Sequence, residues 1–266
     1  MKTLLLFFFA LPAAAAYPAR DLVVPVAGRA TGPDGRTYLT ALRITNTSDR
    51  QADIAMTFHP AAQKLSPISS SLQLAAGETR VLDPYDPGVD AGIGWIRMQS
   101  SRDLIVNSTI YSRLGNTRTS GTSVAAIPAK LAIGNGDATT LQGLAPTASR
   151  YKLYFDEVGG KPLEVWVKLL DARGAEVGRT HVYIDGWQQV VKDVAAPPAA
   201  TVVRVEGMHG RGRVIVTGSA IANGATDAAS FEMSFAPSRD RISNAEAAAY
   251  FACAIGILAA IVVRRR

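Results

Sequence analysis

Cysteine is almost absent from this chain of 266 residues. The one cysteine, Cys253, lies in an apolar segment near the C-terminus, so no disulfide is expected in the rest of the chain. A body of roughly 225 residues can bury enough apolar surface to fold without disulfides, even in a compartment that permits them. We therefore expect a hydrophobic core, and not covalent cross-links, to hold the fold together.

Recognisable catalytic and cofactor motifs are also missing. The sequence has no Gly-x-Ser-x-Gly elbow, no phosphate-binding loop and no dinucleotide-binding glycine fingerprint. Its histidines, His59, His181 and His209, are far apart in the sequence and lack the clustered ligands of a typical metal site. We expect surface or rim histidines, and we predict no catalytic residue, no cofactor-binding residue and no cofactor.

Two polar segments carry alternative interpretations. The segment "DPYDPGVD" places Asp83, Asp86 and Asp90 close together, and such carboxylates are candidate calcium ligands. Its prolines favour a stiff turn instead. The loop "GMHGRGR" at Gly207–Arg213 is a candidate site for an anionic polysaccharide or phosphate, although an ordinary exposed loop is the favoured interpretation.

The formal net charge of +6 does not indicate nucleic-acid binding. Setting aside Lys2, the three C-terminal arginines and Glu246 leaves 24 basic and 21 acidic residues of the original 28 and 22. The remaining balance of +3 over residues 17–245 is ordinary for a body of this size. We therefore predict no nucleic-acid partner.

The N-terminal segment has the layout of a secretory signal peptide. Lys2 precedes an apolar stretch, Leu4–Leu11, and the small residues Ala13–Ala16 follow. This stretch is too short to span a bilayer, and Ala14 and Ala16 fit the small-residue cleavage rule. The sequence predicts a signal peptide over residues 1–16.

The C-terminal segment is predicted to anchor the protein in the membrane. Ala247–Val263 contains seventeen uncharged residues, which is at the lower limit for a transmembrane helix. The aromatic and basic residues that would set its topology are Tyr250, Arg264, Arg265 and Arg266. We expect a stalk at 236–246, a single span at 247–263 and a cytoplasmic tail at 264–266. A buried core helix is the alternative, and removal of the tail by a protease stays open.

Between these ends the apolar residues alternate. "YLTALRITN" and "ADIAMTFHP" carry apolar residues at every second position, as half-buried strands do, and no sustained helical repeat appears. "GWIRMQS" and "LIVNSTIYSRL" are predicted to be two strands joined by the turn "SSRD". The composition indicates an all-β fold.

The second half of the body repeats the first. Gly94–Ser112 matches Thr201–Ala222, and Ala76–Asp83 matches Asp185–Asp193, with offsets of 107 to 111 residues. A repeat of that length is typical of an immunoglobulin-like sandwich. We predict two tandem immunoglobulin-like antiparallel β-sandwiches at 21–128 and 129–235, each with seven or eight strands in two sheets.

The first predicted sandwich contains Pro25-Val26-Ala27, then Tyr38 and Thr40, and then the turn Asn46-Thr47-Ser48. This order resembles a family of bacterial secreted β-sandwich repeats that occur on surface proteins and beside extracellular hydrolases, although tryptophan is usual in that family at the position of Tyr38. In the second copy "FDEVGG" replaces the asparagine turn. The resemblance implies a structural module, and the family supplies no catalytic or binding residue.

Together these features predict a non-enzymatic protein of the bacterial envelope. We expect a single-pass protein of the cell membrane with its body in the periplasm or outside the cell. It would act as a spacer or a protein-interaction module, with another envelope protein as its partner. The alternatives are a carbohydrate-binding or hydrolytic β-sandwich enzyme and a periplasmic chaperone-like assembly factor.

Overall fold

The computed structural model describes residues 17–32, 35–61, 65–88, 92–142, 144, 148–222 and 229–233. The predicted signal peptide, stalk, membrane span and arginine tail lie outside these residues, as does Asp90. Over the described part, no helix is long and apolar enough to cross a membrane. The described strands all belong to a compact unit that ends at Met233.

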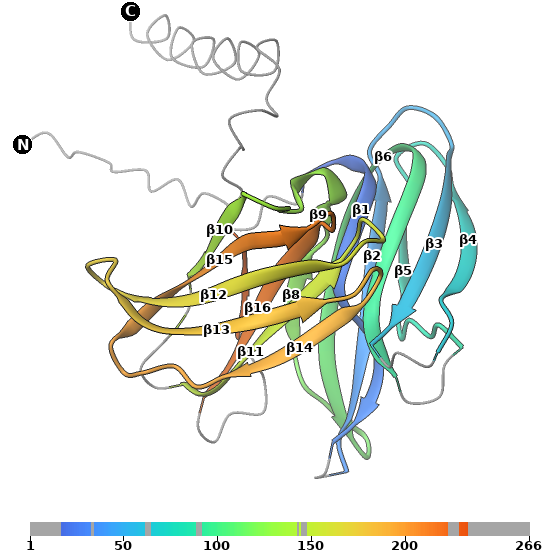
Figure 1. Cartoon of the computed structure of the whole chain (residues 1–266). Coiled ribbons are helices and arrows are strands. Elements are labelled where there is room, and N and C mark those ends of the chain that lie inside the picture. The colour runs from blue at the N-terminus through green and yellow to red at the C-terminus, as the bar shows by residue number, and fades with distance from the viewer. Residues whose placement is uncertain are drawn as a thin grey trace, which may run out of the picture. The chain divides into compact units, whose positions relative to one another are not determined.

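The fold is all-β, as predicted, and the strand pairings are antiparallel (Figure 1). The first strand group comprises β1 (Ala19–Thr31), β2 (Thr37–Asn46), β3 (Ala52–Pro60), β4 (Ile68–Leu74), β5 (Thr79–Leu82), β6 (Ile93–Leu114), β7 (Thr117–Arg118), β8 (Thr122–Ala125) and β9 (Ile127–Pro128). A short 3₁₀ turn, η1 (Ala129–Leu131), follows. The second strand group comprises β10 (Ala138–Gln142), β11 (Ala148–Glu157), β12 (Leu163–Asp171), β13 (Glu176–Ile184), β14 (Gln189–Val194), β15 (Ala200–Gly210), β16 (Val214–Ala222) and β17 (Ala229–Glu232).

The long strand β6 belongs to both halves of the first strand group. Its residues 94–100 pair with β3 and β1, whereas its residues 104–113 pair with β2 and, in part, with β8. Side chains from both sets of strands share one buried core, which includes Leu22, Ile44, Phe58, Met98 and Val106. This arrangement is consistent with a β-sandwich in which β6 passes from one layer to the other.

The predicted turn at "SSRD" is wrong, because β6 is continuous through residues 100–103. Polar residues occur there because the strand changes its pairing partners at that point. Ser101 Oγ accepts the Asp53 N–H at 3.0 Å, and the Asp103 carbonyl accepts the Thr47 hydroxyl at 2.9 Å. A short polar run therefore marks a crossing between layers here, although the same pattern is typical of turns.

The second strand group repeats the pairing order of the first. Its sheets run β10-β15-β12-β13 and β14-β11-β16-β17, and the first group contains the corresponding series β1-β6-β3-β4 and β5-β2-β6-β8. Consecutive strands β15 and β16 lie in different sheets, unlike strands F and G of constant-type immunoglobulin domains. Both groups belong to the unit that ends at Met233, so their independence as two domains stays a prediction.

The core of the second group follows the alternation seen in the sequence. On β12 the side chains of Leu163, Val165 and Val167 are buried, while the residues between them face outward. Burial of each such side chain contributes about 1.5–3 kcal/mol to folding. This spacing fixes the register of β12 between β13 and β15, because a shift by one residue would expose the apolar row.

Candidate functional site

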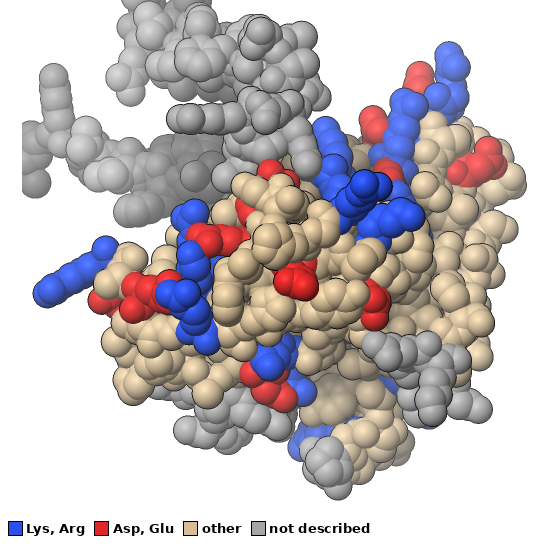
Figure 2. All heavy atoms as spheres, in the orientation of Figure 1, with Lys and Arg blue, Asp and Glu red and all other residues tan. Residues whose placement is uncertain are grey.

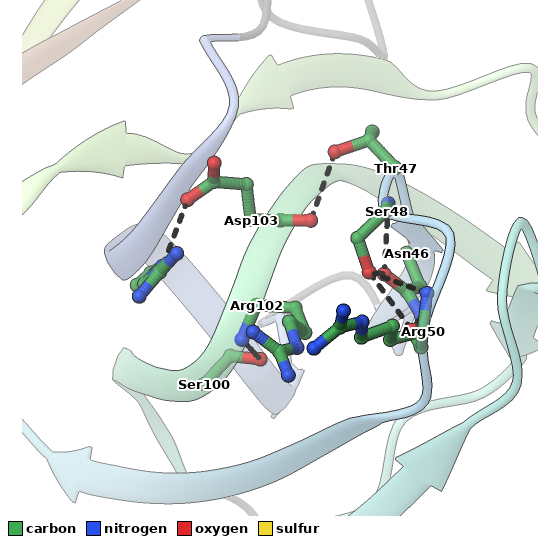
Figure 3. A network of polar contacts seen from close by, with 8 residues as sticks. Asn46, Thr47, Ser48, Arg50, Ser100, Arg102 and Asp103 are labelled. Carbon is green, nitrogen blue, oxygen red and sulfur yellow. Dashed lines mark hydrogen bonds and ion pairs between the residues drawn. The ribbon is translucent and has the colours of Figure 1, made fainter.

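A buried amide organises the turn after β2. Asn46 Nδ2 donates to the carbonyl oxygens of Arg50 at 2.7 Å, Ala75 at 2.8 Å and Leu74 at 3.3 Å. Its Oδ1 accepts hydrogen bonds from the backbone N–H and the hydroxyl of Ser48 (Figure 3). The Asn46-Thr47-Ser48 turn is therefore structural.

Glu157 takes the corresponding place at the end of β11. This carboxylate is completely buried and accepts four backbone N–H groups, from Gly159, Gly160, Trp187 and Arg213, at 2.7–2.8 Å. Asn46 and Glu157 are the last residues of equivalent strands, and each pairs with the first residues of the strand segment that crosses to the other layer. Glu157 could be identified from the sequence by comparing the last residues of equivalent strands, but not by searching for a second Asn turn motif.

Trp187 adopts an unusual backbone conformation beside Glu157. Its φ is +63°, and it is the one non-glycine residue of the described part with a positive φ. In the first group the equivalent position is Gly77, which has a φ of +67°. The equivalence follows from two backbone hydrogen bonds. The Asn46 N–H donates to the carbonyl of Glu78, which follows Gly77, and the Glu157 N–H donates to the carbonyl of Gln188, which follows Trp187. A side chain in this region costs roughly 1–2 kcal/mol relative to glycine. Strain of this kind is concentrated at functional sites.

Three rings stack where the two strand groups meet. The His59 ring lies parallel to Trp95, with centroids 4.1 Å apart, and 5.5 Å from the ring of Trp187. Burial, with a contribution from the nearby Arg97 charge, lowers the pKa of His59 from 6.5 to about 4. His59 is only 7 % exposed, so the prediction of a surface or rim histidine is wrong for it. His181 and His209 are exposed.

An ion pair fixes Arg97 beside this stack. Its guanidinium donates to both carboxylate oxygens of Asp21, at 2.8 and 2.9 Å, and to the carbonyl of Val158 at 3.2 Å. The bond to Asp21 is the main cause that raises the pKa of Arg97. Because Val158 belongs to the second group, Arg97 connects the two groups.

A second contact between the groups passes through Gln189. Its Nε2 donates to the Pro25 carbonyl of β1 at 2.8 Å and to Asp156 Oδ1 at 2.7 Å. Burial raises the pKa of Asp156 well above the usual value. Asp156 Oδ2 and Gln189 Oε1 are buried without a hydrogen-bond partner in the described structure. Pro25 and Gln189 are 164 positions apart in the chain.

An open pocket of about 750 Å³ lies at this junction. Its lining includes one exposed aromatic ring and side chains of both charges: Arg20, Asp21, Arg97, Lys130, Trp187 and Arg213. Figure 2 shows Lys and Arg side chains gathered, with some Asp and Glu among them, over the part of the body where Figure 1 places β9 and β1. A second and larger hollow, of about 970 Å³, is lined by β3, β4, β5 and β6 and has no aromatic side chain in its lining. We refer to the first hollow as the junction pocket.

The loop Gly207–Arg213 contributes to the junction pocket through Arg213. The Arg213 guanidinium donates to the carbonyl oxygens of Lys130 at 3.0 Å and Ala132 at 2.6 Å. His209 and Arg211 are exposed. The loop considered from sequence for anion binding therefore places one arginine at the pocket.

The predicted aspartate cluster has other partners. Asp83 Oδ1 accepts a hydrogen bond from the Tyr111 hydroxyl at 2.6 Å, and its Oδ2 accepts one from Arg118 at 2.8 Å. Both bonds lower the pKa of Asp83, and the bond from Tyr111 has the larger effect. Asp86 Oδ1 accepts the Gly88 N–H at 2.8 Å, and Asp90 lies outside the described residues. Within the described ranges, no three His, Cys, Asp or Glu side chains form a group suited to a metal ion.

Comparisons with known proteins give little further information. No protein-family model matches the chain, and no curated protein matches it. A solved structure with detectable similarity is the crystal structure of Thermotoga maritima 1070, at 18 % identity. That alignment covers 41 % of this chain and 94 % of the other, with a TM-score of 0.34, which is too low to carry an argument.

Proposed function

We propose that this protein is an exported, membrane-anchored and non-enzymatic spacer or interaction module of the bacterial envelope. In this proposal, residues 1–16 direct export and residues 247–263 hold the chain in the membrane. The two strand groups are immunoglobulin-like sandwiches in the broad sense that shares architecture without the exact strand order. The body faces the periplasm or the exterior, and its partner is another envelope protein.

The observation that supports this role is the set of side-chain contacts that lock the two strand groups together. Gln189 reaches the Pro25 carbonyl, Arg97 reaches the Val158 carbonyl, and His59 stacks on Trp187. Tandem domains move relative to one another by default unless their interface is large and well packed. A body whose two halves are held together by such contacts keeps a fixed length, which is what a spacer requires.

Fractionation combined with protease protection tests the location. We expect the full chain to remain in the membrane fraction after a high-salt wash. We also expect added protease to digest the body in spheroplasts, under conditions in which cytosolic proteins stay protected. Removal of residues 247–266 should release the body in soluble form outside the cytoplasm. Protection of the body in spheroplasts would contradict the proposal.

Affinity capture from solubilised envelopes tests the interaction role. The full chain should retain a defined envelope protein that a charge-matched unrelated membrane protein does not retain. Junction variants that loosen the two strand groups should retain the same partner with lower yield. Recovery of the same proteins by both baits would argue against an interaction module.

A further inference from the structure

Trp187 is the most informative residue of the junction pocket. It occupies a position where the first strand group has glycine, and it keeps a φ of +63° that a bulky side chain rarely adopts. Trp187 is 41 % exposed and lines the pocket, so part of its surface is accessible to a ligand. An exposed indole held in a strained conformation is a candidate ligand platform.

The charges around the indole favour an anionic ligand. The Arg97 guanidinium lies 5.5 Å from the Trp187 ring but is bound to Asp21. Arg20 binds Asp103 at 3.3 Å, yet its side chain is 61 % exposed. Lys130 is exposed and makes no ion pair with any residue that the structure describes. Arg20 and Lys130 are therefore the cations that a ligand can reach.

Two backbone donors in the pocket wall are already engaged, which restricts how a ligand can bind there. The N–H groups of Gly159 and Arg213 both donate to the buried carboxylate of Glu157. Pro18 and Pro128, which also line the pocket, have no N–H to donate. A phosphate group or an extended peptide, which are commonly bound through main-chain donors, therefore cannot use the N–H groups of Gly159 and Arg213.

We propose that the junction pocket binds a hexuronate residue of an acidic polysaccharide. The apolar face of the sugar ring lies against the Trp187 indole, and its carboxylate lies toward Lys130 and Arg20. The pocket volume of about 750 Å³ falls within the range of small-ligand sites. This inference goes beyond the spacer role and does not depend on the membrane anchor.

Calorimetric titration of the full chain in detergent with trigalacturonate tests the proposal. The fully methyl-esterified trimer keeps the rings without the charge, and hexaglutamate keeps the charge without the rings. We expect saturable binding of trigalacturonate with a Kd of roughly 0.1–1 mM, and binding at least about tenfold weaker for both other probes. Raising the salt concentration should weaken the trigalacturonate signal, because the charge contribution is exposed.

Two variants and one control locate the binding in the pocket. Lys130→Glu, at an exposed position, should weaken binding about tenfold, whereas Arg173→Glu in the exposed β12–β13 turn should leave it unchanged. Trp187→Gly should abolish binding and keep the fold, since glycine is the residue of the equivalent turn. Absence of saturable binding, equal binding of either comparison probe, or wild-type affinity in Lys130→Glu or in a folded Trp187→Gly would each overturn the proposal.

Discussion

Asp156 and Glu157 are adjacent carboxyl groups that are both fully buried in different surroundings. Glu157 accepts hydrogen bonds from four backbone N–H groups. Asp156 receives a single donor, the amide of Gln189, and burial raises its pKa. Glu157 therefore holds three connections together as a hydrogen-bond acceptor, whereas burial favours the uncharged form of Asp156 between the strand groups.

Glu157→Gln is expected to destabilise the protein strongly. The amide keeps the size of the side chain but replaces one acceptor oxygen by a donor that faces two backbone N–H groups. Loss of bonds to a buried charged acceptor costs on the order of 3 kcal/mol. Urea unfolding measures the change, and Glu164→Gln, at a partly exposed ion pair with His181, is the control and should change stability by less than about 1 kcal/mol.

Asp156→Asn is expected to remove a pH dependence of stability. Because the folded-state pKa of Asp156 is raised, the folded chain binds more protons than the unfolded chain above about pH 4. Wild-type stability should therefore fall as the pH rises from about 4 toward the folded-state pKa. The variant should lack this fall and be at least as stable as wild type at about pH 8. Asp193→Asn, at an exposed site, should retain the wild-type slope.

His59→Phe is expected to remove a pH dependence of opposite sign. The pKa of His59 is lowered to about 4, so the unfolded chain binds more protons between about pH 4 and 6.5. Wild type should lose about 3 kcal/mol of stability as the pH falls through this window, while the variant should not. The matched variant His181→Phe alters an exposed ring and should behave as wild type. Identical pH profiles for His59→Phe and wild type would contradict the burial of a neutral imidazole.

At the scale of elements, the strands could be predicted from the sequence but one connection could not. The alternation of Val165 and Val167 with outward residues identifies β12 directly. The crossing inside β6 could not be recognised, because "SSRD" has the same composition in a turn and in a strand that changes partners. Glu157 was missed for a related reason, since its role depends on N–H groups from three separate loops.

The turn between β11 and β12 supplies a prediction about backbone space. Gly160 has a φ of +71°, and a Cβ there would lie 2.6 Å from the Trp187 indole nitrogen. Gly174, in the β12–β13 turn, has a φ of +81° and no atom within 4 Å of such a Cβ. We expect Gly174→Ala to cost about 1 kcal/mol from backbone strain alone and Gly160→Ala to cost roughly 2–4 kcal/mol. Thermal unfolding measures both changes, and equal costs would show that the indole does not occupy this position.

At the scale of the whole molecule, the sequence predicts two similar halves but gives no sign of how they are joined. The repeat is visible because equivalent strands carry similar residues at an almost constant offset. The junction combines His59 with Trp187 and Pro25 with Gln189, pairs that no local pattern connects. A single histidine in a sequence is expected at the surface, and the burial of His59 is explained only by the rings of Trp95 and Trp187 around it.

Gln189→Ala is expected to separate the unfolding of the two strand groups. Its amide bridges the Pro25 carbonyl and Asp156, and its loss leaves two buried polar groups without their donor. In wild type, hydrogen exchange of peptides from β6 and from β12 should report the same cooperative opening, because the junction couples both groups. In Gln189→Ala the two sets of peptides should open at different denaturant concentrations. Gln73→Ala, which removes a side-chain bond to Asp53 within the first group, should preserve coincident opening. If the β6 and β12 peptides of Gln189→Ala still open together at the wild-type midpoint, then Gln189 does not couple the two halves.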